Sequence, residues 1–468
     1  MRTKTFPIHP ILTAGPALFL FDTALAITAW SAVVAVAFAD PAAGRVGGLI
    51  HLSLYPVAYL LLLYALGLYR RDALLETRKS LVRAPLAAVF GALLAGAATA
   101  VLPLPLTADA TSTLIATAMS CFMVAGFVAR IALFALRQRG MFRRRLLIVG
   151  AGKRAWDLVW LLRREGRTLA YDIGFIHDAA MGEIDPRLES AEDSLIIPAE
   201  RGFLAIARHV GADQIVVAPD ERRGLPMHAL LRCKTAGFPV TEYLGFLERE
   251  IGRVDIKRLE LGWLLFSDGF CFGTLDRVLK RSLDLAVSLG GLLLGGPLLA
   301  IGALAVMLDD GGPVLYRQTR ITRDGRAFRI TKLRTMRMDA EQAGAVWAAD
   351  QDPRITRVGR FLRRTRLDEL PQLFSVLTGD MSLVGPRPER PEFTQSLAAQ
   401  LPLYHERHLV KAGLTGWAQI NYPYGASVDD ARSKLSYDLY YVKNQGILLD
   451  LLIILQTLRV LLWPGGVR

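Results

Sequence analysis

Cysteine is scarce in this chain, with three residues among 468, at positions 121, 233 and 271. They lie far apart and form no CxxC pair, so the sequence indicates neither a disulfide framework nor a cysteine-ligated metal site. Acidic residues are also in the minority, with 43 Asp and Glu against 56 Lys and Arg, a formal charge of +13. This excess suits anionic lipid, phosphorylated substrates or nucleic acid, and only the placement of the charges separates these partners.

Apolar residues make up 52% of the chain, a content typical of membrane proteins. Within residues 1–140, four apolar stretches approach the length of about 20 residues that a spanning helix needs. Lys and Arg gather before the first, between the second and third, and after the fourth, so both ends of this region are predicted to face the cytoplasm. Asp22 and Arg130 lie near those cytoplasmic ends, where pairing or snorkelling accounts for them. The four stretches are 11–39, 49–69, 84–106 and 111–136.

A fifth apolar stretch runs from Leu285 to Leu308. Basic residues flank it on both sides, so a full crossing would leave one strongly basic flank outside the cell. Gly296 and Pro297 lie at its centre, where proline removes a helical donor and favours a sharp bend. Two interpretations fit: a broken helix over 279–308 that re-enters by the same face, and an ordinary kinked spanning helix.

Residues 141–268 have the pattern of an α/β domain. An apolar strand and a glycine turn, LLIVGAG, precede an amphipathic helix. Gly150, Gly152 and Ala155 form a variant of the dinucleotide-binding fingerprint, but Asp178 lies farther along than the roughly 20 residues expected for a ribose contact. The sequence therefore predicts a Rossmann-like fold and favours its use in packing or oligomerisation, while nucleotide binding and a homodimer both stay open.

Two adjacent carboxylates, Asp368 and Glu369, stand among arginines just ahead of Pro371. Apolar residues at helical spacing follow, and Gly379 ends the predicted helix. The proline must stand near the helix start, so Asp368 is predicted as the N-cap and Glu369 as part of the first turn. The pair either caps a helix and nothing more, or supplies an ionised nucleophile and a metal ligand, with Mg²⁺ the expected partner of Glu369.

Basic side chains are available to offset the charge of a phosphoryl group beside this pair. Asp324-Gly325 predicts a β-hairpin, on which Lys332 and Arg334 would share a face and grip phosphate. In GPRPE, two prolines flank Arg387 and would present its guanidinium with little loss of entropy. Arg363 and Arg366, just before the carboxylates, complete the candidate set.

From about Leu275 onward the chain resembles the bacterial sugar transferases that initiate glycan assembly, the polyprenyl-phosphate hexose-1-phosphate transferases. The four spans and the Rossmann-like region are similar to the N-terminal extension of the family's large members. LLFSDGF and INYPYGAS are similar to the branch that initiates exopolysaccharide synthesis. One departure stands at Gly296, where the family usually has serine before the proline. The shared segments are KRSLDLAVSL, GGPVLYRQTR, KLRTM, RTRLDELPQLFSVLTGDMSLVGPRPE, KAGLTGWAQIN and KLSYDLYYVKN.

The resemblance implies a protein of the bacterial cytoplasmic (inner) membrane with three parts: an α-helical transmembrane bundle, an α/β Rossmann-like domain, and an α+β catalytic domain over 275–468 that carries the re-entrant helix. It implies transfer of hexose-1-phosphate from a UDP-hexose to undecaprenyl phosphate, with release of UMP and an intermediate on Asp368. Glu369 would hold Mg²⁺. Lys332, Arg363 and Arg387 would lie near the phosphates, and Asp438, which matches a family acid, would belong to the same substrate-binding set. Membrane lipid is an expected partner and nucleic acid is not.

Two other classes of function stay open. A membrane-anchored NAD-dependent nucleotide-sugar dehydratase would also place a Rossmann domain after four spans, but the chain has no Tyr-x-x-x-Lys pair for the proton relay of such enzymes. A non-catalytic membrane scaffold or regulator of polysaccharide assembly would not need Asp368, Glu369, Lys332 and Arg387. No side chain indicates which hexose is transferred.

Overall fold

The chain folds into two compact units, Met1–Phe246 and Leu247–Arg468. The computed structural model describes residues 14–37, 45–69, 77–101, 108–138, 143–164, 171–190, 195–256, 269–270, 272–338, 340, 352–423, 425 and 427–462. Most of the basic loops that orient the spans, and most of LLFSDGF, lie outside these residues.

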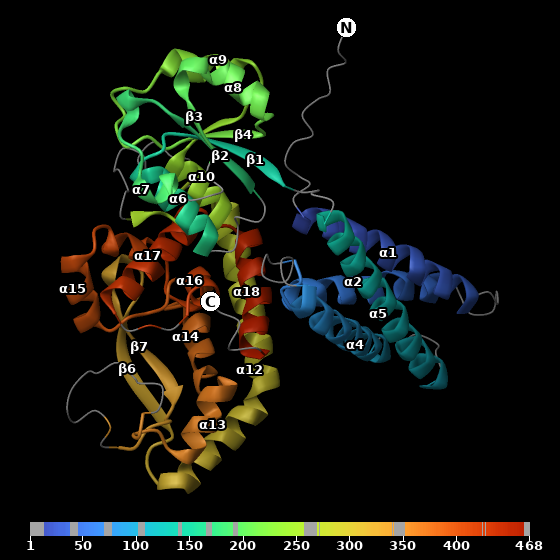
Figure 1. Cartoon of the computed structure of the whole chain (residues 1–468). Coiled ribbons are helices and arrows are strands. Elements are labelled where there is room, and N and C mark those ends of the chain that lie inside the picture. The colour runs from blue at the N-terminus through green and yellow to red at the C-terminus, as the bar shows by residue number, and fades with distance from the viewer. Residues whose placement is uncertain are drawn as a thin grey trace. The chain divides into compact units, whose positions relative to one another are not determined.

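The N-terminal part of the first unit is a bundle of four helices (Figure 1). Neighbouring pairs pack in the order α1–α2–α4–α5, and α5 packs back on α1. Trp30 stacks on Tyr55 and Tyr59 on Phe122, with ring centroids 5.0 and 4.6 Å apart. Three of these helices are long and apolar enough to cross a membrane, and α2 contains the shorter apolar segment Ser53–Ala65. The helices are α1 (Ala14–Ala37), α2 (Arg45–Ala65), α4 (Thr77–Val101) and α5 (Ala108–Gln138).

Asp22 on α1 and Arg130 on α5 form an ion pair inside this bundle. Both side chains are buried, with 1% of each exposed. The Tyr69 hydroxyl donates to Asp22 Oδ2 at 2.8 Å. The two predicted intramembrane charges are therefore paired with each other, the solution that an apolar environment favours.

The rest of the first unit is an α/β domain whose five parallel strands lie in the order β3-β2-β1-β4-β5. This order is typical of doubly wound sheets that bind dinucleotides. In Figure 1, α8 and α9 cover one face of the sheet and α6 the other. The strands are β1 (Arg144–Val149), β2 (Tyr171–His177), β3 (Leu195–Pro198), β4 (Gln214–Val217) and β5 (Val240–Glu242). The helices are α6 (Lys153–Arg164), η3 (Ala179–Met181), α7 (Pro186–Glu189), η4 (Ala199–Arg201), α8 (Phe203–Val210) and α9 (Met227–Thr235). A further helix, α10 (Tyr243–Ile251), begins in the first unit and ends in the second.

The glycine turn of this sheet is closed by a carboxylate of the chain itself. Asp220 accepts hydrogen bonds from the backbone N–H groups of Lys153 and Arg154, at 2.6 and 2.8 Å, at the start of α6. In dinucleotide-binding domains the pyrophosphate occupies this helix start. A Cβ atom on Gly152 would come 2.2 Å from Asp220 Oδ2. Asp178 caps η3 through Ala180 N at 3.0 Å. These contacts favour packing over nucleotide binding.

In the second unit, α12 runs as one helix from Thr274 to Asp310. It passes Gly296 and Pro297 without a non-helical residue, so the two predicted arms are joined by continuous helix rather than by a break. A proline deletes one backbone donor and strains the turn before it, and the remaining hydrogen bonds can carry the helix past it. Figure 1 shows that the helix changes direction along its length. Re-entry into the membrane stays a prediction.

The outer face of α12 is apolar and uncovered. Leu293, Leu294 and Leu308 are 77%, 81% and 78% exposed, and other apolar side chains of the helix accompany them. A contiguous apolar surface of this kind marks a contact with protein or membrane. It fits the membrane segment that the sequence predicts here.

A β-hairpin follows, built from β6 (Leu315–Ile321) and β7 (Ala327–Leu333) in antiparallel pairing. Its turn contains η6 (Arg323–Gly325), where Asp324 and Gly325 have φ of 57° and 72°. Asp and Gly tolerate this left-handed conformation better than other residues. The predicted hairpin is confirmed.

The remaining elements surround a core beneath the hairpin. The core includes Phe328, Val376, Met381, Tyr441 and Ile453. Ile453 lies on α18, so this apolar helix near the C-terminus docks on the domain. Residues after Phe246 already belong to the second unit, although the sequence indicates a boundary at 268. Val254 N, for example, donates to Ser436 O at 3.0 Å. The elements are α13 (Arg357–Thr365), η7 (Leu367–Glu369), α14 (Gln372–Thr378), β8 (Ser382–Val384), α15 (Pro391–Gln400), η8 (Tyr404–Leu409), β9 (Gly413–Thr415), α16 (Trp417–Asn421), α17 (Val428–Lys443) and α18 (Ile447–Leu462).

Candidate active site

A pocket of about 1230 Å³ lies in the second unit, lined by the hairpin, η7, the GPRPE loop, α16 and α17. This volume exceeds the roughly 300–1,000 Å³ of ordinary small-molecule sites, so it has room for more than one substrate group. Among the residues that the structure describes, twelve Lys and Arg line the pocket against four Asp and Glu. A cavity with this charge attracts anions.

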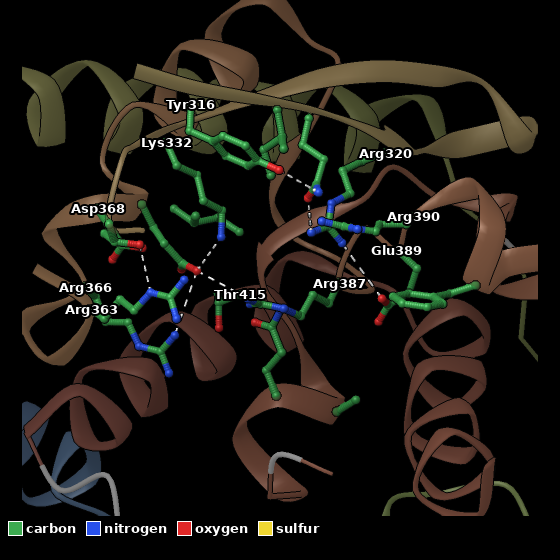
Figure 2. Close-up of a pocket in the computed structure, with 18 of the residues that line it drawn as sticks. Tyr316, Arg320, Lys332, Arg363, Arg366, Asp368, Arg387, Glu389, Arg390 and Thr415 are labelled. Atoms are coloured by element: carbon green, nitrogen blue, oxygen red, sulfur yellow. Dashed lines mark hydrogen bonds and ion pairs between the residues drawn. The ribbon is translucent and has the colours of Figure 1, made fainter. Parts of the chain in front are cut away.

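Asp368 and Glu369 lie at the wall of this pocket, in the 3-10 turn η7 (Figure 2). The predicted N-cap role of Asp368 is wrong. Pro371 stands at the start of α14, and no side chain caps either η7 or α14. Because Arg366 adopts a left-handed conformation (φ 60°) and opens a separate turn, the carboxylates precede the helix instead of capping it.

Asp368 is buried, and its Oδ1 atom has no hydrogen-bond partner among the described residues. Burial, together with the neighbouring charge of Glu369, raises the pKa of Asp368 to about 6. Lys332, Arg363 and Arg366 act against this rise. The carboxylate is thus ionised near neutral pH without a tight ion pair, which is the state that an attacking oxygen requires.

Glu369 is held by cations. Its Oε1 atom lies 3.0 Å from Lys332 Nζ, 3.3 Å from Arg387 Nη2 and 3.8 Å from Arg366 Nη1. Burial opposes its charge, but Lys332, Arg387 and Arg366 keep the pKa of Glu369 well below its usual range. Burial also lowers the pKa of Lys332. Glu369 is therefore a permanent anion beside Asp368.

The sequence also predicts Arg363, Arg334 and Asp438 as site residues. Arg363 lines the pocket and donates from Nε to Thr335 Oγ1 at 2.8 Å. Arg334 follows β7 and pairs with Asp310 at the end of α12, so it does not meet the carboxylates as Lys332 does. Asp438 on α17 is 2% exposed and accepts hydrogen bonds from Arg407.

Sequence reasoning missed Arg320 and Arg407, which line the same pocket. Arg320 had a usable signal, because exposed and half-buried residues alternate along β6 and place it on the inner face with Tyr316 and Gln318. Arg407 lies in YHERHL, where no period or motif distinguishes it from a surface residue. Its role depends on contacts across the fold.

The carboxylate pair has donor chemistry that suits Mg²⁺. This ion prefers carboxylate oxygens, and it commonly takes one or two of them together with water and substrate phosphate. Asp368 Oδ1 is without a protein partner, and Glu369 is ionised. No group of three His, Cys, Asp or Glu side chains suited to a metal occurs within the described residues, so phosphate and water would complete the site.

Comparisons with known proteins assign the C-terminal part of the chain to a family. A family model described as bacterial sugar transferase matches residues 275–464. An Aeromonas hydrophila protein, UDP-N-acetylgalactosamine-undecaprenyl-phosphate N-acetylgalactosaminephosphotransferase, is 42% identical over 51% of this chain and 56% of its own length. An Escherichia coli (strain K12) protein, UDP-glucose:undecaprenyl-phosphate glucose-1-phosphate transferase, is 41% identical over 39% of this chain and 40% of its own.

A third relative is short and is matched almost completely. The exopolysaccharide production protein PSS of Rhizobium leguminosarum bv. phaseoli is 43% identical over 39% of this chain and 94% of its own length. By contrast, the chain spans about half the length of the first two relatives. The range that the family model matches includes Asp368 and Glu369. The chain belongs to the bacterial sugar transferase family.

Proposed function

We propose that the protein transfers hexose-1-phosphate from a UDP-hexose to undecaprenyl phosphate and so initiates exopolysaccharide assembly. The observation that carries this proposal is Asp368, a buried carboxylate in a basic pocket, with one oxygen that has no partner among the residues that the structure describes. The relatives' names, which specify undecaprenyl-phosphate sugar phosphotransferases, support the acceptor and the class of donor.

The reaction proceeds in two displacements. An Asp368 oxygen attacks the β-phosphorus of the donor, the bond from that phosphorus to the bridging oxygen breaks, and UMP leaves with the bond's electron pair. A phosphate oxygen of the polyprenyl phosphate then attacks the same phosphorus, which frees the Asp368 carboxylate and forms polyprenyl-diphosphate-hexose. One diphosphate bond replaces another, so catalysis consists mainly of positioning and charge neutralisation.

The cations around the carboxylates supply that neutralisation. Lys332 and Arg387 hold Glu369 and stand beside the space where the phosphoryl group would be attacked. Glu369, with the donor's phosphates, would bind Mg²⁺, which offsets phosphate charge when bound. Arg363, at the end of α13, lines the same pocket.

The membrane arrangement follows from α12. We propose that its uncovered apolar face enters the cytoplasmic leaflet of the inner membrane and leaves by the same side, bent near Pro297. The basic flanks then stay among anionic headgroups, each cation contributing about 1 kcal/mol near the surface. The pocket would lie at the depth of the acceptor's phosphate.

The test is UMP release from a panel of UDP-sugars, among them UDP-glucose, UDP-galactose and UDP-N-acetylgalactosamine, with purified full-length protein, Mg²⁺ and undecaprenyl phosphate. Asp368→Asn should abolish both UMP and lipid-linked sugar, because an amide of the same shape is not a nucleophile. Glu248→Gln, a buried substitution away from the pocket, serves as the matched control. Activity in Asp368→Asn equal to that of the parent would refute the nucleophile. A folded parent that releases no UMP from any donor would favour a scaffold.

A further inference from the structure

The loop that carries Arg387 is fixed through its backbone carbonyls. Four consecutive carbonyl oxygens, from 386 to 389, each accept a hydrogen bond from another part of the unit. Two of the donors are arginine side chains, which is unusual because most loop carbonyls bond to backbone or water. The bonds are Pro386 O with Gly413 N at 2.9 Å, Arg387 O with Arg407 Nη2 at 3.1 Å, Pro388 O with Arg320 Nη1 at 3.0 Å, and Glu389 O with Ile321 N at 3.0 Å.

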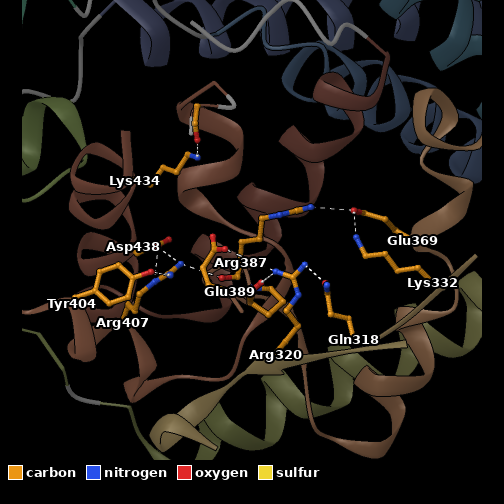
Figure 3. Close-up of polar contacts among 12 residues, drawn as sticks. Gln318, Arg320, Lys332, Glu369, Arg387, Glu389, Tyr404, Arg407, Lys434 and Asp438 are labelled. Atoms are coloured by element: carbon orange, nitrogen blue, oxygen red, sulfur yellow. Dashed lines mark hydrogen bonds and ion pairs between the residues drawn. The ribbon is translucent and has the colours of Figure 1, made fainter. Parts of the chain in front are cut away.

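Arg407 is itself held by three groups at once (Figure 3). Its Nε and Nη2 atoms donate to Asp438 Oδ2 at 3.1 and 2.8 Å, and its Nη1 atom donates to the Tyr404 hydroxyl at 2.8 Å. The side chains of Arg407 and Asp438 are 5% and 3% exposed. A planar guanidinium used in this way has one available orientation, which lysine cannot reproduce.

The chain of contacts leads from Asp438 to the carboxylate pair. Asp438 orients Arg407, Arg407 bonds the backbone of Arg387, and Arg387 Nη2 lies 3.3 Å from Glu369 Oε1. Arg387 is 40% exposed on its side chain, so the loop backbone contributes much of its orientation. Displacement of a catalytic group by about 1 Å can reduce a rate about 100-fold.

We propose that Asp438 and Arg407 are positioning residues, which set where the Arg387 guanidinium stands relative to Glu369 and the donor's phosphates. This inference rests on the proposed function and deepens it. The sequence predicts that Asp438 contacts the substrate directly. In this proposal Asp438 acts through Arg407 instead. Arg320, on the hairpin, donates in the same way to the next carbonyl oxygen of the loop, that of Pro388.

A second buried ion pair on α17 provides the matched control. Lys443 Nζ lies 2.6 Å from Glu248 Oε2, with side chains 4% and 11% exposed. Asp438→Asn and Glu248→Gln each remove one buried carboxylate charge. Asp438 lies on α17, and Glu248 pairs with Lys443 of the same helix. Among the described residues, Arg407, the partner of Asp438, bonds to the GPRPE loop, and no such bond links Lys443 to it. Both should lower the unfolding temperature, since each leaves a buried cation unpaired.

The experiment measures kcat and KM of UMP release in Asp438→Asn, Arg407→Lys and Glu248→Gln. We expect kcat to fall about 10- to 100-fold in the first two, with KM for the UDP-sugar changed less than about threefold, and kcat within about twofold of the parent in the control. Loss of kcat in Glu248→Gln equal to that in Asp438→Asn would mean that general destabilisation explains both, and the proposal would fall.

Combination with Arg387→Met tests whether the effect passes through Arg387. In that background Asp438→Asn should cost less than about threefold in kcat, because the group it positions is already gone. Losses that multiply would overturn the proposal.

If the folded parent releases no UMP, the proposed function fails, and hydrogen exchange of the peptide over 385–393 decides the positioning inference separately. Faster exchange in Asp438→Asn than in Glu248→Gln supports it, and equal exchange refutes it.

Discussion

Asp368 and Glu369 are adjacent in the chain, yet their surroundings move their pKa values in opposite directions. Burial and the charge of Glu369 raise the pKa of Asp368 to about 6, whereas three cations hold that of Glu369 well below its usual range. Two carboxylates whose pKa values are pushed apart divide roles between them. Here Glu369, which stays charged, lies beside three cations, and Asp368 is the carboxylate that we propose as the nucleophile.

The pH dependence of UMP release should report Asp368. In the proposed reaction its ionised form attacks, and its folded-state pKa is raised to about 6, so the rate should be constant above pH 7. Below pH 6 the rate should fall about tenfold per pH unit as the carboxyl group becomes protonated. Initial rates between pH 5 and 8 at saturating UDP-sugar measure this. A flat profile down to pH 5 would contradict the assignment.

Lys332 should set the position of that acid limb. Its charge lowers the pKa of Asp368, so Lys332→Met should move the limb to higher pH and also reduce the maximal rate. Lys434→Met is the control, because Lys434 lines the same pocket but interacts with Glu389 and Asp430 instead. An unchanged limb in Lys332→Met, or an equal shift in both variants, would argue against the electrostatic role.

At the residue level the sequence revealed the chemistry better than the geometry. Composition and spacing singled out Asp368, Glu369, Lys332 and Arg387, since phosphate chemistry needs those side chains, and the structure brings the four into one pocket. The N-cap assignment failed because it assumed that a helix starts at Asp368, while the chain makes a separate turn first. Arg407 escaped notice because two of its partners, Arg387 and Asp438, lie 20 and 31 residues away.

At the level of elements, the α/β domain combines a nucleotide-binding topology with a blocked binding position. The Asp220 carboxylate takes the two N–H groups at the start of α6 that a phosphate would need. A phosphate would have to displace it and would meet its negative charge. The fold alone therefore does not carry the function that its strand order suggests.

We expect the full-length protein not to bind NADH or NAD⁺ through this domain at millimolar concentration. NADH fluorescence, with Gly152→Val as the control that closes the turn, measures this. Saturable NADH binding that Gly152→Val abolishes would contradict it. Asp220→Ala should also destabilise the domain by about 1–2 kcal/mol, because two N–H groups at a helix start lose their acceptor.

The Asp22–Arg130 pair ties α1 to α5 within the apolar bundle. Arg130→Met leaves Asp22 buried without its cation, and we expect a cost of about 2–5 kcal/mol. Adding Asp22→Asn should recover part of this loss, since the uncompensated charge is then removed. Unfolding of the detergent-solubilised protein, followed by helical circular dichroism, gives the cycle. Additive losses would mean that the two charges do not stabilise each other.

Elements with strong local signals were predicted well. Asp324-Gly325 requires left-handed backbone and fixed the hairpin, and the apolar runs gave the helices of the bundle. The continuity of α12 through Pro297 was not predictable, because the cost of one lost hydrogen bond competes with packing that sequence does not reveal. The docking of α18 likewise depends on Ile453 reaching a core assembled from distant segments.

For the whole molecule, apolar surface is exposed on two separate parts of the chain. The bundle shows Leu20, Val124 and Ile131, and α12 shows Leu293 and Leu294. Lipid is the covering that suits both, because each face is larger and more apolar than soluble surfaces tolerate. Composition predicted this membrane character. The division into units at 246/247 could not be predicted from composition, because it depends on which core Val254 and Ile256 join.

The two ends of α12 should lie on the same side of the membrane. Its flanks hold exposed arginines, and moving one flank across the bilayer would carry several charges through hydrocarbon. In a variant without the three native cysteines, Arg277→Cys and Arg317→Cys in sealed spheroplasts should both resist a membrane-impermeant maleimide until the cells are lysed. Ser112→Cys, at the start of α5 on the predicted outer side, should react in intact spheroplasts. Labelling of one α12 flank but not the other before lysis would show a full crossing, and the pocket would then have to meet its acceptor by another route.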